Sequence, residues 1–331
     1  MGHRGTRRSH SRLSATAIYR SKVTRPTLLL FGANGQLGSE LARTLTLVGE
    51  VTPITRNDCD INDADAIGRV IANVKPQLVI NATAYTAVDK AESEPEVARL
   101  ANEIAPGVMA RAANKIGAGL VHYSTDYVFD GRSVDPYRED DPVAPQSVYG
   151  RTKLAGENAI RESDCAHLIF RTSWIYGQQG NNFVKTILRL ASTRDELKIV
   201  ADQMGAPTWS RVIADTTTLV LESLNLKQRT NWLSEVSGTY HLTANGATNW
   251  FEFAREIIAL GQSHGLLSDK VATLTSTTTA AYAAPAPRPA NSHLDNEKLA
   301  RTFGIRIPNW RVSAEQFIAG LGSYCFYQQL R

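Results

Sequence analysis

The sequence predicts an α/β protein built on a doubly wound parallel sheet. Short apolar runs alternate with amphipathic segments as far as about residue 178, and a glycine-rich loop follows the first run. After residue 178 the alternation becomes less regular, as expected of a second, smaller C-terminal domain. Strands buried on both faces are continuously apolar, and right-handed crossovers place helices on both faces of their sheet. Such folds bind ligands at the carboxyl ends of the strands.

The alternation defines the elements in order. Strands are expected at 27–31, 50–55, 76–84, 118–125 and 167–177, with a late strand of the same sheet at 238–244. Helices are expected at 37–49, 63–75, 96–117 and from Ser147, then at 181–192, 249–260 and 294–304. The stretch 273–292 is rich in Thr, Ala and Pro, and we expect an ordered loop there.

The charge of the chain is concentrated in its first 26 residues. They carry seven Lys or Arg and no acid, against a formal charge of +4 for all 331 residues. The rest of the chain is close to neutral, so no nucleic-acid partner is expected. The leader resembles a transit peptide in its Arg and Ser content, but a disordered tail or a start codon placed too early explains it as well.

The chain lacks membrane-spanning and cysteine-pair patterns, and this bears on its cellular compartment and on the metal sites it could hold. No apolar run is long enough to span a bilayer, so no membrane association is expected. Cys59, Cys165 and Cys325 are widely scattered with no C-x-x-C pair, which indicates neither a disulfide framework nor a zinc site. We therefore expect a cytoplasmic protein.

The glycine-rich loop "FGANGQLGSEL" predicts a dinucleotide site. Gly32, Gly35 and Gly38 lie between a strand and a helix. The first permits a tight turn, the second lets backbone N–H groups approach a pyrophosphate, and the third lets helix and strand pack closely. This pattern makes the first domain Rossmann-type.

The choice between NADPH and NADH depends on the end of the second strand. Arg56 stands there, in "ITRNDCDIND", and a guanidinium accommodates a 2′-phosphate. Asp58 and Asp60 follow it, and a carboxylate would instead hold a free ribose hydroxyl. NADPH is favoured, and NADH stays open.

The segment "VYGRTKLAGE" places Tyr149 four residues before Lys153. In a helix the two side chains share a face, and a Lys ammonium beside a phenol lowers the pKa of the phenol. A Tyr packing its ring with a Lys extending past it gives the same pattern. The hydroxyl of Thr125, at the end of the fourth strand, supplies a third polar group at the same edge of the sheet.

The chain combines a glycine loop, a hydroxyl at the end of the fourth strand and a Tyr–Lys pair. In this combination it resembles the extended short-chain dehydrogenase/reductase superfamily. The blocks "HYSTDYVFDG", "RTSWIYG", "DQMGAPT" and "RPANSHLDNEKL" resemble, within it, the dTDP-4-dehydrorhamnose reductase family from about residue 27 to near the C-terminus. The resemblance implies reduction of the C4 ketone of dTDP-4-dehydro-β-L-rhamnose by NADPH or NADH, the last step of dTDP-L-rhamnose synthesis. Tyr149 would be the general acid, Lys153 would lower its pKa and hold the nicotinamide ribose, and Thr125 would complete the set.

The resemblance also assigns binding residues. The cofactor would contact the glycine loop, the residues near the adenine, the loop after the third strand and the Tyr–Lys pair, through Gly35, Gln36, Leu37, Asp60, Ile61, Ala84, Tyr85, Thr86, Tyr149 and Lys153. The nucleotide sugar would contact Thr125, Asp126, Trp174, Arg288 and Asn291. The division expected is a dinucleotide-binding domain at 27–178 plus about 207–245, and a nucleotide-sugar-binding domain at about 179–206 plus 246–331.

One position departs from the family pattern. Some reductases of this family are thought to bind Mg²⁺ through acids near a dimer contact, and Glu40 and Glu297 match two of them. Arg211 stands where a third acid is expected. A guanidinium repels a cation, so we expect no metal and either a monomer or a homodimer.

Two other functions remain open from the sequence. Another nucleotide-sugar reductase or epimerase would share the fold and the Tyr–Lys pair. A non-catalytic regulatory subunit, resembling the dinucleotide-binding partner of methionine adenosyltransferase, would not need Thr125, Tyr149 and Lys153, all of which are present.

Overall fold

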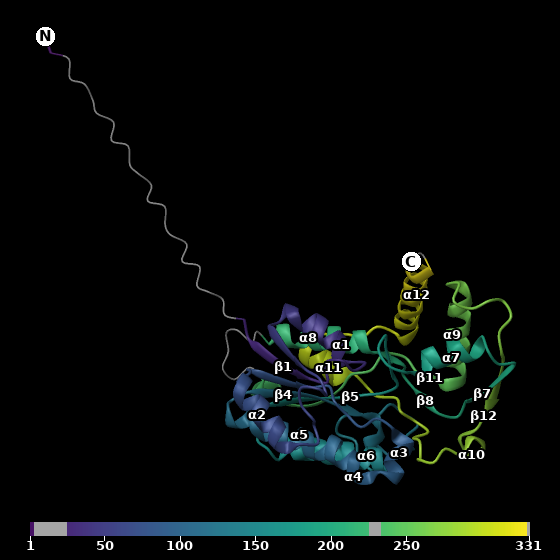
Figure 1. Cartoon of the computed structure of the whole chain (residues 1–331), viewed down its shortest axis with the longest axis horizontal. Coiled ribbons are helices and arrows are strands. Elements are labelled where there is room, and N and C mark those ends of the chain that lie inside the picture. Colours follow the sequence, from purple (N-terminus) through teal and green to yellow (C-terminus); the bar gives the residue numbers. More distant parts are fainter. Residues whose placement is uncertain (3–24, 225–232, 330–331) are drawn as a thin grey trace.

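A six-stranded parallel sheet forms the centre of the molecule (Figure 1). The computed structural model describes residues 1–2, 25–224 and 233–329, so most of the predicted leader lies outside the described residues. The strand order is β2-β1-β3-β4-β5-β10. The strands are β1 (Thr27–Phe31), β2 (Glu50–Ile54), β3 (Leu78–Asn81), β4 (Gly119–Thr125), β5 (His167–Thr172) and β10 (Gly238–His241). The predicted doubly wound fold is confirmed, including its late sixth strand.

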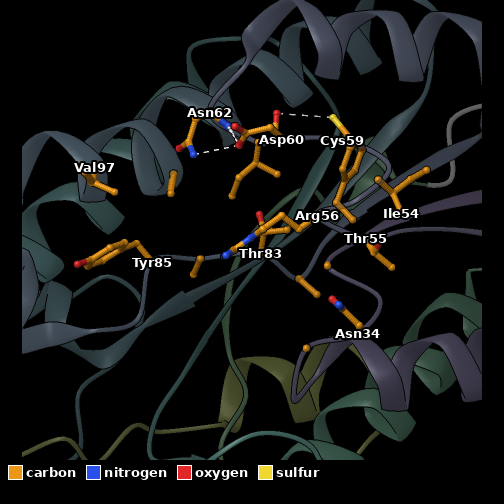
Figure 2. Close-up of a pocket in the computed structure, with 17 residues that line it drawn as sticks. Asn34, Ile54, Thr55, Arg56, Cys59, Asp60, Asn62, Thr83, Tyr85 and Val97 are labelled. Atoms are coloured by element: carbon orange, nitrogen blue, oxygen red, sulfur yellow. Dashed lines mark hydrogen bonds between the residues drawn. The ribbon is translucent and has the colours of Figure 1, made fainter.

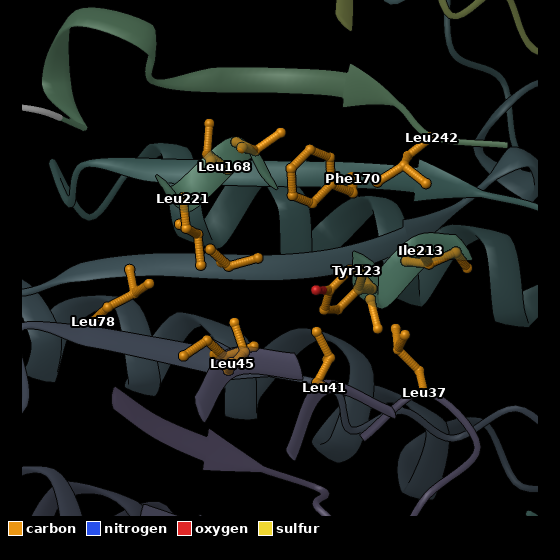
Figure 3. Close-up of a cluster of buried hydrophobic side chains, with 14 of the residues drawn as sticks. Leu37, Leu41, Leu45, Leu78, Tyr123, Leu168, Phe170, Ile213, Leu221 and Leu242 are labelled. Atoms are coloured by element: carbon orange, nitrogen blue, oxygen red, sulfur yellow. The ribbon is translucent and has the colours of Figure 1, made fainter. Parts of the chain in front are cut away.

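Helices cover both faces of this sheet (Figure 1). One face packs against α2 (Ala64–Val74), α5 (Ala105–Lys115) and α6 (Val148–Arg161). The other packs against α1 (Gly38–Thr44), α8 (Ser210–Ser223) and α11 (Glu297–Phe303). Figure 3 shows this second core, to which Leu41 of α1, Leu221 of α8 and Phe170 of β5 all contribute. Burying such side chains contributes ~1.5–3 kcal/mol each, which fixes the helices and the loops between them.

The segment 96–117, predicted as one helix, is three consecutive elements. α4 (Pro95–Arg99) is followed by a π-helix, η2 (Leu100–Ile104), and then by α5. The wider turn brings the backbone of Asn102 against α6, where a Cβ on Gly156 would lie only 2.0 Å from its carbonyl oxygen. Apolar periodicity alone does not reveal a π-turn. Further α-helices that were not predicted, among the residues the structure describes, are α3 (Val88–Ser93), α8, α10 (Thr279–Tyr282) and α12 (Trp310–Gln329).

The C-terminal part has a hydrophobic core of its own, built by α7 (Phe183–Ala191), α9 (Trp250–Ser263) and α12. Parallel strands β7 (Glu196–Val200) and β12 (Thr273–Thr277) line it. The prediction of a loop throughout 273–292 was therefore wrong. Its first half forms β12 and α10. The Thr-rich run 273–277 is a strand because it pairs with β7.

The strand predicted at 167–177 is also interrupted. β5 ends at Thr172, and β6 (Ile175–Tyr176) pairs with β9 (Thr208–Trp209) in a separate two-stranded sheet. A second such sheet joins β8 (Met204–Gly205) to β11 (Thr248–Asn249). Trp174, at φ +48°, turns the chain from the large sheet into β6.

The two domains predicted from the sequence share elements of one core. Leu299 and Ile307, from the C-terminal segment, pack with α1 and α8 on the large sheet. Because this core contains residues of both predicted domains, the limits given above for the two domains stay a prediction. None of the helices in the described part of the chain has both the length and the apolar character needed to cross a bilayer.

Candidate active site

A cavity of about 630 Å³ opens at the carboxyl ends of β1, β2 and β3 (Figure 2). The chain passes from β1 to β2 on one side and later to β3 on the other, so the sheet changes winding direction at this point. Ligands of doubly wound proteins bind at such a switch. Seven predicted cofactor residues line the cavity: Gly32, Gly35, Arg56, Asp60, Ile61, Ala84 and Tyr85.

The glycine loop has the close packing that its spacing predicts. Gly32 has a φ of +81°, which L-residues with a side chain rarely adopt. A Cβ on Gly38 would lie 1.9 Å from the Gly32 carbonyl oxygen, so only glycine lets α1 start this close to β1. The loop therefore places the backbone at the start of α1 at the edge of the cavity.

Arg56 and the two nearby acids have different surroundings. Arg56 and Asp60 line the cavity, and Asp60 accepts hydrogen bonds from the backbone and side chain of Asn62. Asp58 is instead bound by Thr55, through its N–H at 2.9 Å and its hydroxyl at 2.6 Å. That hydroxyl and N–H lower the pKa of Asp58, which stabilises the turn after β2.

Six of the predicted cofactor residues do not line the cavity, and two of these, Tyr149 and Lys153, lie on α6. Leu37 is buried in the core against α8, and Gly38 packs within the turn. Thr86 is exposed beyond Tyr85. The side-chain oxygen of Gln36 (Oε1) accepts a hydrogen bond of 2.9 Å from the side-chain NH₂ of Asn182, at the start of α7. Gln36 therefore connects the glycine loop to the C-terminal part.

Tyr149 lies in the first turn of α6, directly after the helix cap. Ser147 caps the helix by accepting from the Gly150 N–H at 3.1 Å. Gly150 packs so closely on Tyr127 that a Cβ would lie 2.3 Å from the Tyr127 carbonyl oxygen. The Tyr149 ring meets the Tyr127 ring edge to face at 5.4 Å. Helix α6 is thus held tightly against the residues that follow Thr125.

The electrostatics of Tyr149 differ from the expectation. Burial raises the pKa of Tyr149 to about 12, while the Thr125 hydroxyl opposes the rise. Lys153 is not among the groups that shift this pKa; its Nζ donates to the Tyr123 carbonyl at 2.6 Å and lies 3.1 Å from His122 Nε2. A phenol with a raised pKa is protonated at neutral pH, as a proton donor must be.

Thr125 and Asp126 are buried beside Tyr149 at the end of β4. The Thr125 hydroxyl donates to Asp126 Oδ1 at 3.0 Å and accepts from the Tyr127 N–H at 3.2 Å. Burial raises the pKa of Asp126 to about 6. The end of β4 therefore holds a hydroxyl and an acid that titrates near neutral pH within one short turn.

Trp174 belongs to an aromatic stack that joins the two parts of the molecule. Its ring lies 3.6 Å from that of Trp250, nearly parallel, and Phe183 packs on Trp250 at 4.5 Å. The backbone of Gly205 touches Trp174 so closely that a Cβ would lie 2.5 Å from the indole. Because a bulky residue at positive φ is strained, these contacts must hold Trp174 in place.

Arg288 and Asn291 are engaged by the protein itself. Arg288 forms a two-point ion pair with Asp89 of α3, at 2.9 and 2.8 Å. Asn291 donates to the carbonyls of Ser133 and Asp135. Both residues thereby fasten the 283–292 segment over the end of the large sheet.

The acids considered for a metal are paired with arginines. Glu40 is bound by Arg43 at 3.2 Å and by Arg211 at 3.2 Å. Glu297 lies 3.9 Å from Arg306. Among the residues that the structure describes, no group of three or more His, Cys, Asp or Glu could hold a metal ion.

Comparison with known proteins places this site in a family. Residues 26–322 match the family model described as RmlD substrate binding domain. The dTDP-4-dehydrorhamnose reductase of Burkholderia thailandensis is 46% identical over 285 residues, covering 86% of this chain and 95% of the relative. That of Escherichia coli is 42% identical, covering 88% and 96%. The chain belongs to the dTDP-4-dehydrorhamnose reductase family.

Solved structures of the family agree with the fold. A dTDP-4-dehydrorhamnose reductase from Clostridium acetobutylicum aligns with a TM-score of 0.80 at 40% identity, over 89% of this chain and 99% of that one. The Bacillus anthracis enzyme, solved in complex with NADP, also aligns at 0.80, with 33% identity over the same shares. A UDP-glucose 4-epimerase from Thermus thermophilus, at 16% identity and a TM-score of 0.71, shares the fold alone.

Three residues near the site were missed by the sequence analysis. Buried Asn102 connects the Tyr85 backbone to Thr152 of α6 through three hydrogen bonds. Trp250 supports Trp174, and buried His122 contacts Lys153. Only His122 could have been noticed in the sequence, as a titratable residue that directly follows the apolar part of its strand. Nothing in the sequence singles out Asn102 or Trp250.

Proposed function

We propose that this chain reduces the C4 ketone of dTDP-4-dehydro-β-L-rhamnose to give dTDP-L-rhamnose. The observation that carries the proposal is the 46% identity to a dTDP-4-dehydrorhamnose reductase over nearly its full length. The site supports it, because Thr125, Asp126 and Tyr149 gather at the end of β4 next to the dinucleotide cavity.

The residues around the cavity fit a nicotinamide dinucleotide. Gly32 and Gly38 leave no space for a Cβ, so the loop backbone can approach a pyrophosphate at the start of α1. Ile61 would lie near the adenine, and Ala84 and Tyr85 would flank the cofactor after β3; all three line the cavity. Bound there, the reduced dinucleotide supplies the hydride.

Tyr149 provides the proton in this mechanism. Its phenol is protonated at neutral pH, since burial raises its pKa to about 12. The Thr125 hydroxyl would bind the substrate carbonyl oxygen, and the Tyr149 O–H would give its proton to that oxygen as negative charge develops. Lys153, one turn later on the same face of α6, would stabilise the phenolate left behind.

Arg56 supports a preference for NADPH. It lines the cavity after β2, and its guanidinium suits a 2′-phosphate. Asp58 does not line the cavity and is bound by Thr55, whereas Asp60 does line it. Replacing Arg56 by Leu should weaken NADPH binding by ~10-fold or more and leave NADH binding nearly unchanged. Equal losses for both dinucleotides would contradict this role.

The reductase itself is tested by comparing the native protein with Tyr149→Phe. Oxidation of NADPH in the presence of dTDP-4-dehydrorhamnose should fall by ~10²–10⁴-fold in the variant, while NADPH binding, followed by fluorescence, persists. Native protein that binds NADPH without turning over this sugar would favour a different nucleotide sugar or the regulatory-subunit alternative.

A further inference from the structure

His122 is a buried histidine that the proposed mechanism does not use. It lies in β4, fully shielded from solvent, between Asn81 of β3 and Lys153 of α6. Its Nδ1 is 3.1 Å from Asn81 Nδ2, and its Nε2 is 3.1 Å from Lys153 Nζ. Each ring nitrogen therefore faces another nitrogen. In each of these two pairs, one nitrogen must donate a proton and the other must accept it.

Thr83 determines the orientation of Asn81. The Asn81 oxygen accepts from the Thr83 N–H at 3.0 Å and from the Thr83 hydroxyl at 2.6 Å. Because a backbone N–H can only donate, the Asn81 oxygen has to face Thr83, and its NH₂ group has to face the ring. His122 Nδ1 is consequently an acceptor and carries no proton.

The other ring nitrogen must then carry the proton. Burial, the largest cause, lowers the pKa of His122 well below 6.5, so the ring is neutral. A neutral imidazole with a bare Nδ1 has its proton on Nε2, directed at Lys153 Nζ. If Lys153 were an ammonium, its N–H groups would point at the His122 Nε2–H, and neither group could accept. If Lys153 is a neutral amine, its lone pair accepts the hydrogen bond from Nε2–H.

We propose that His122 is the positioning residue for Lys153. Its Nε2–H holds the Lys153 side chain as a neutral amine against β4, and the same amine donates to the Tyr123 carbonyl. When Nζ takes up a proton from water, it loses the lone pair that accepts from the ring, and the ammonium is released towards Tyr149. The catalytic consequence rests on the proposed function, in which Lys153 acts as an ammonium.

The neighbouring charges leave both states of Lys153 accessible near neutral pH. Burial lowers the pKa of Lys153 to about 8, and Glu157, one turn further along α6, opposes the fall. Glu157 is itself paired with Arg171 of β5 at 2.7 Å and with Arg161 at 2.6 Å. On β5, burial also lowers the pKa of His167, which adds no full positive charge at neutral pH.

The tautomer of His122 tests the proposal directly. Nitrogen NMR of the ¹⁵N-labelled full chain distinguishes a protonated from a bare ring nitrogen, and loss of signals in His122→Gln assigns them. We expect the proton on Nε2 and a bare Nδ1 above neutral pH. A proton on Nδ1, or on both nitrogens, would overturn the proposal. The measurement needs no turnover, so its failure is separate from failure of the reductase function.

Asn81→Asp should reverse the arrangement. A carboxylate accepts from both Thr83 and a ring Nδ1–H, which leaves Nε2 to accept from a Lys153 ammonium. The ring signals should exchange, and the pH at which kcat/KM falls on the alkaline side should rise by about one unit. His167→Gln, a histidine on β5 outside this chain of bonds, is the control and should change neither. An Asp variant that folds and keeps both the native tautomer and the native pH profile would refute the role of Asn81; if it does not fold, the native tautomer decides alone.

Discussion

A side chain at Gly150 should misplace the proton donor. A Cβ at this position would lie 2.3 Å from the Tyr127 carbonyl oxygen and 3.0 Å from Pro145 Cβ. Neither atom is the free end of a flexible side chain, so α6 and the turn after Thr125 must separate by about 1 Å to restore normal contact. Tyr149 is adjacent to Gly150, so this movement changes the position of its phenol relative to the Thr125 hydroxyl.

We expect Gly150→Ala to lower kcat by about 100-fold, the loss typical of a 1 Å error in a reacting group. The forced contact should also cost about 1–3 kcal/mol of the free energy of unfolding. The first quantity is measured as NADPH oxidation with dTDP-4-dehydrorhamnose, and the second by urea unfolding.

Gly68→Ala is the matched control. Gly68 lies within α2, where a Cβ would have no neighbour within 4 Å. This substitution should stabilise the protein by about 0.5–1 kcal/mol, since alanine favours a helix, and leave kcat unchanged. Native kcat and stability in Gly150→Ala would refute the argument that close packing of α6 positions Tyr149.

Three further predictions concern residues that support the site. Trp250→Leu removes the ring stacked on Trp174 and should raise KM for the nucleotide sugar while NADPH affinity is retained; a change in NADPH affinity alone would contradict it. Asn102→Ala should weaken NADPH binding measured by fluorescence, because it frees the Tyr85 backbone. Burial raises the pKa of Glu157, but the hydrogen bond and charge of Arg171, helped by Arg161, leave that pKa lower than usual. The stability that this pairing gives is therefore present above the ordinary carboxyl pKa and is lost as the pH falls through the lowered pKa. Glu157→Gln should cost ~3–5 kcal/mol in denaturant titration at neutral pH, and a loss that persists unchanged at low pH would count against the pairing.

Local sequence determined the large sheet and the place of the dinucleotide site. The four central strands were predictable because strands buried on both faces are largely apolar, and the edge strands at 50–54 and 238–241 were predictable from their place in the alternation. The glycine loop was predictable for a similar reason, since Gly32 and Gly38 occupy positions that exclude a side chain. Such constraints act within a few residues and are therefore readable from the chain itself.

Tertiary structure decided what the polar side chains do. Arg288 pairs with Asp89, and Asn291 donates to two backbone carbonyls, all distant in sequence, while contact of these two residues with the nucleotide sugar stays a prediction. The Thr-rich run at 273–277 became a strand only because β7 offers it an edge.

The Tyr–Lys pair shows the division most clearly. The spacing of Tyr149 and Lys153 put both on one face of α6, and this much the sequence alone determined. Whether the ammonium lowers the phenol pKa depends on burial and on His122, which comes from another strand. A pKa is set by every group around the proton, and those neighbours are assembled only by the fold.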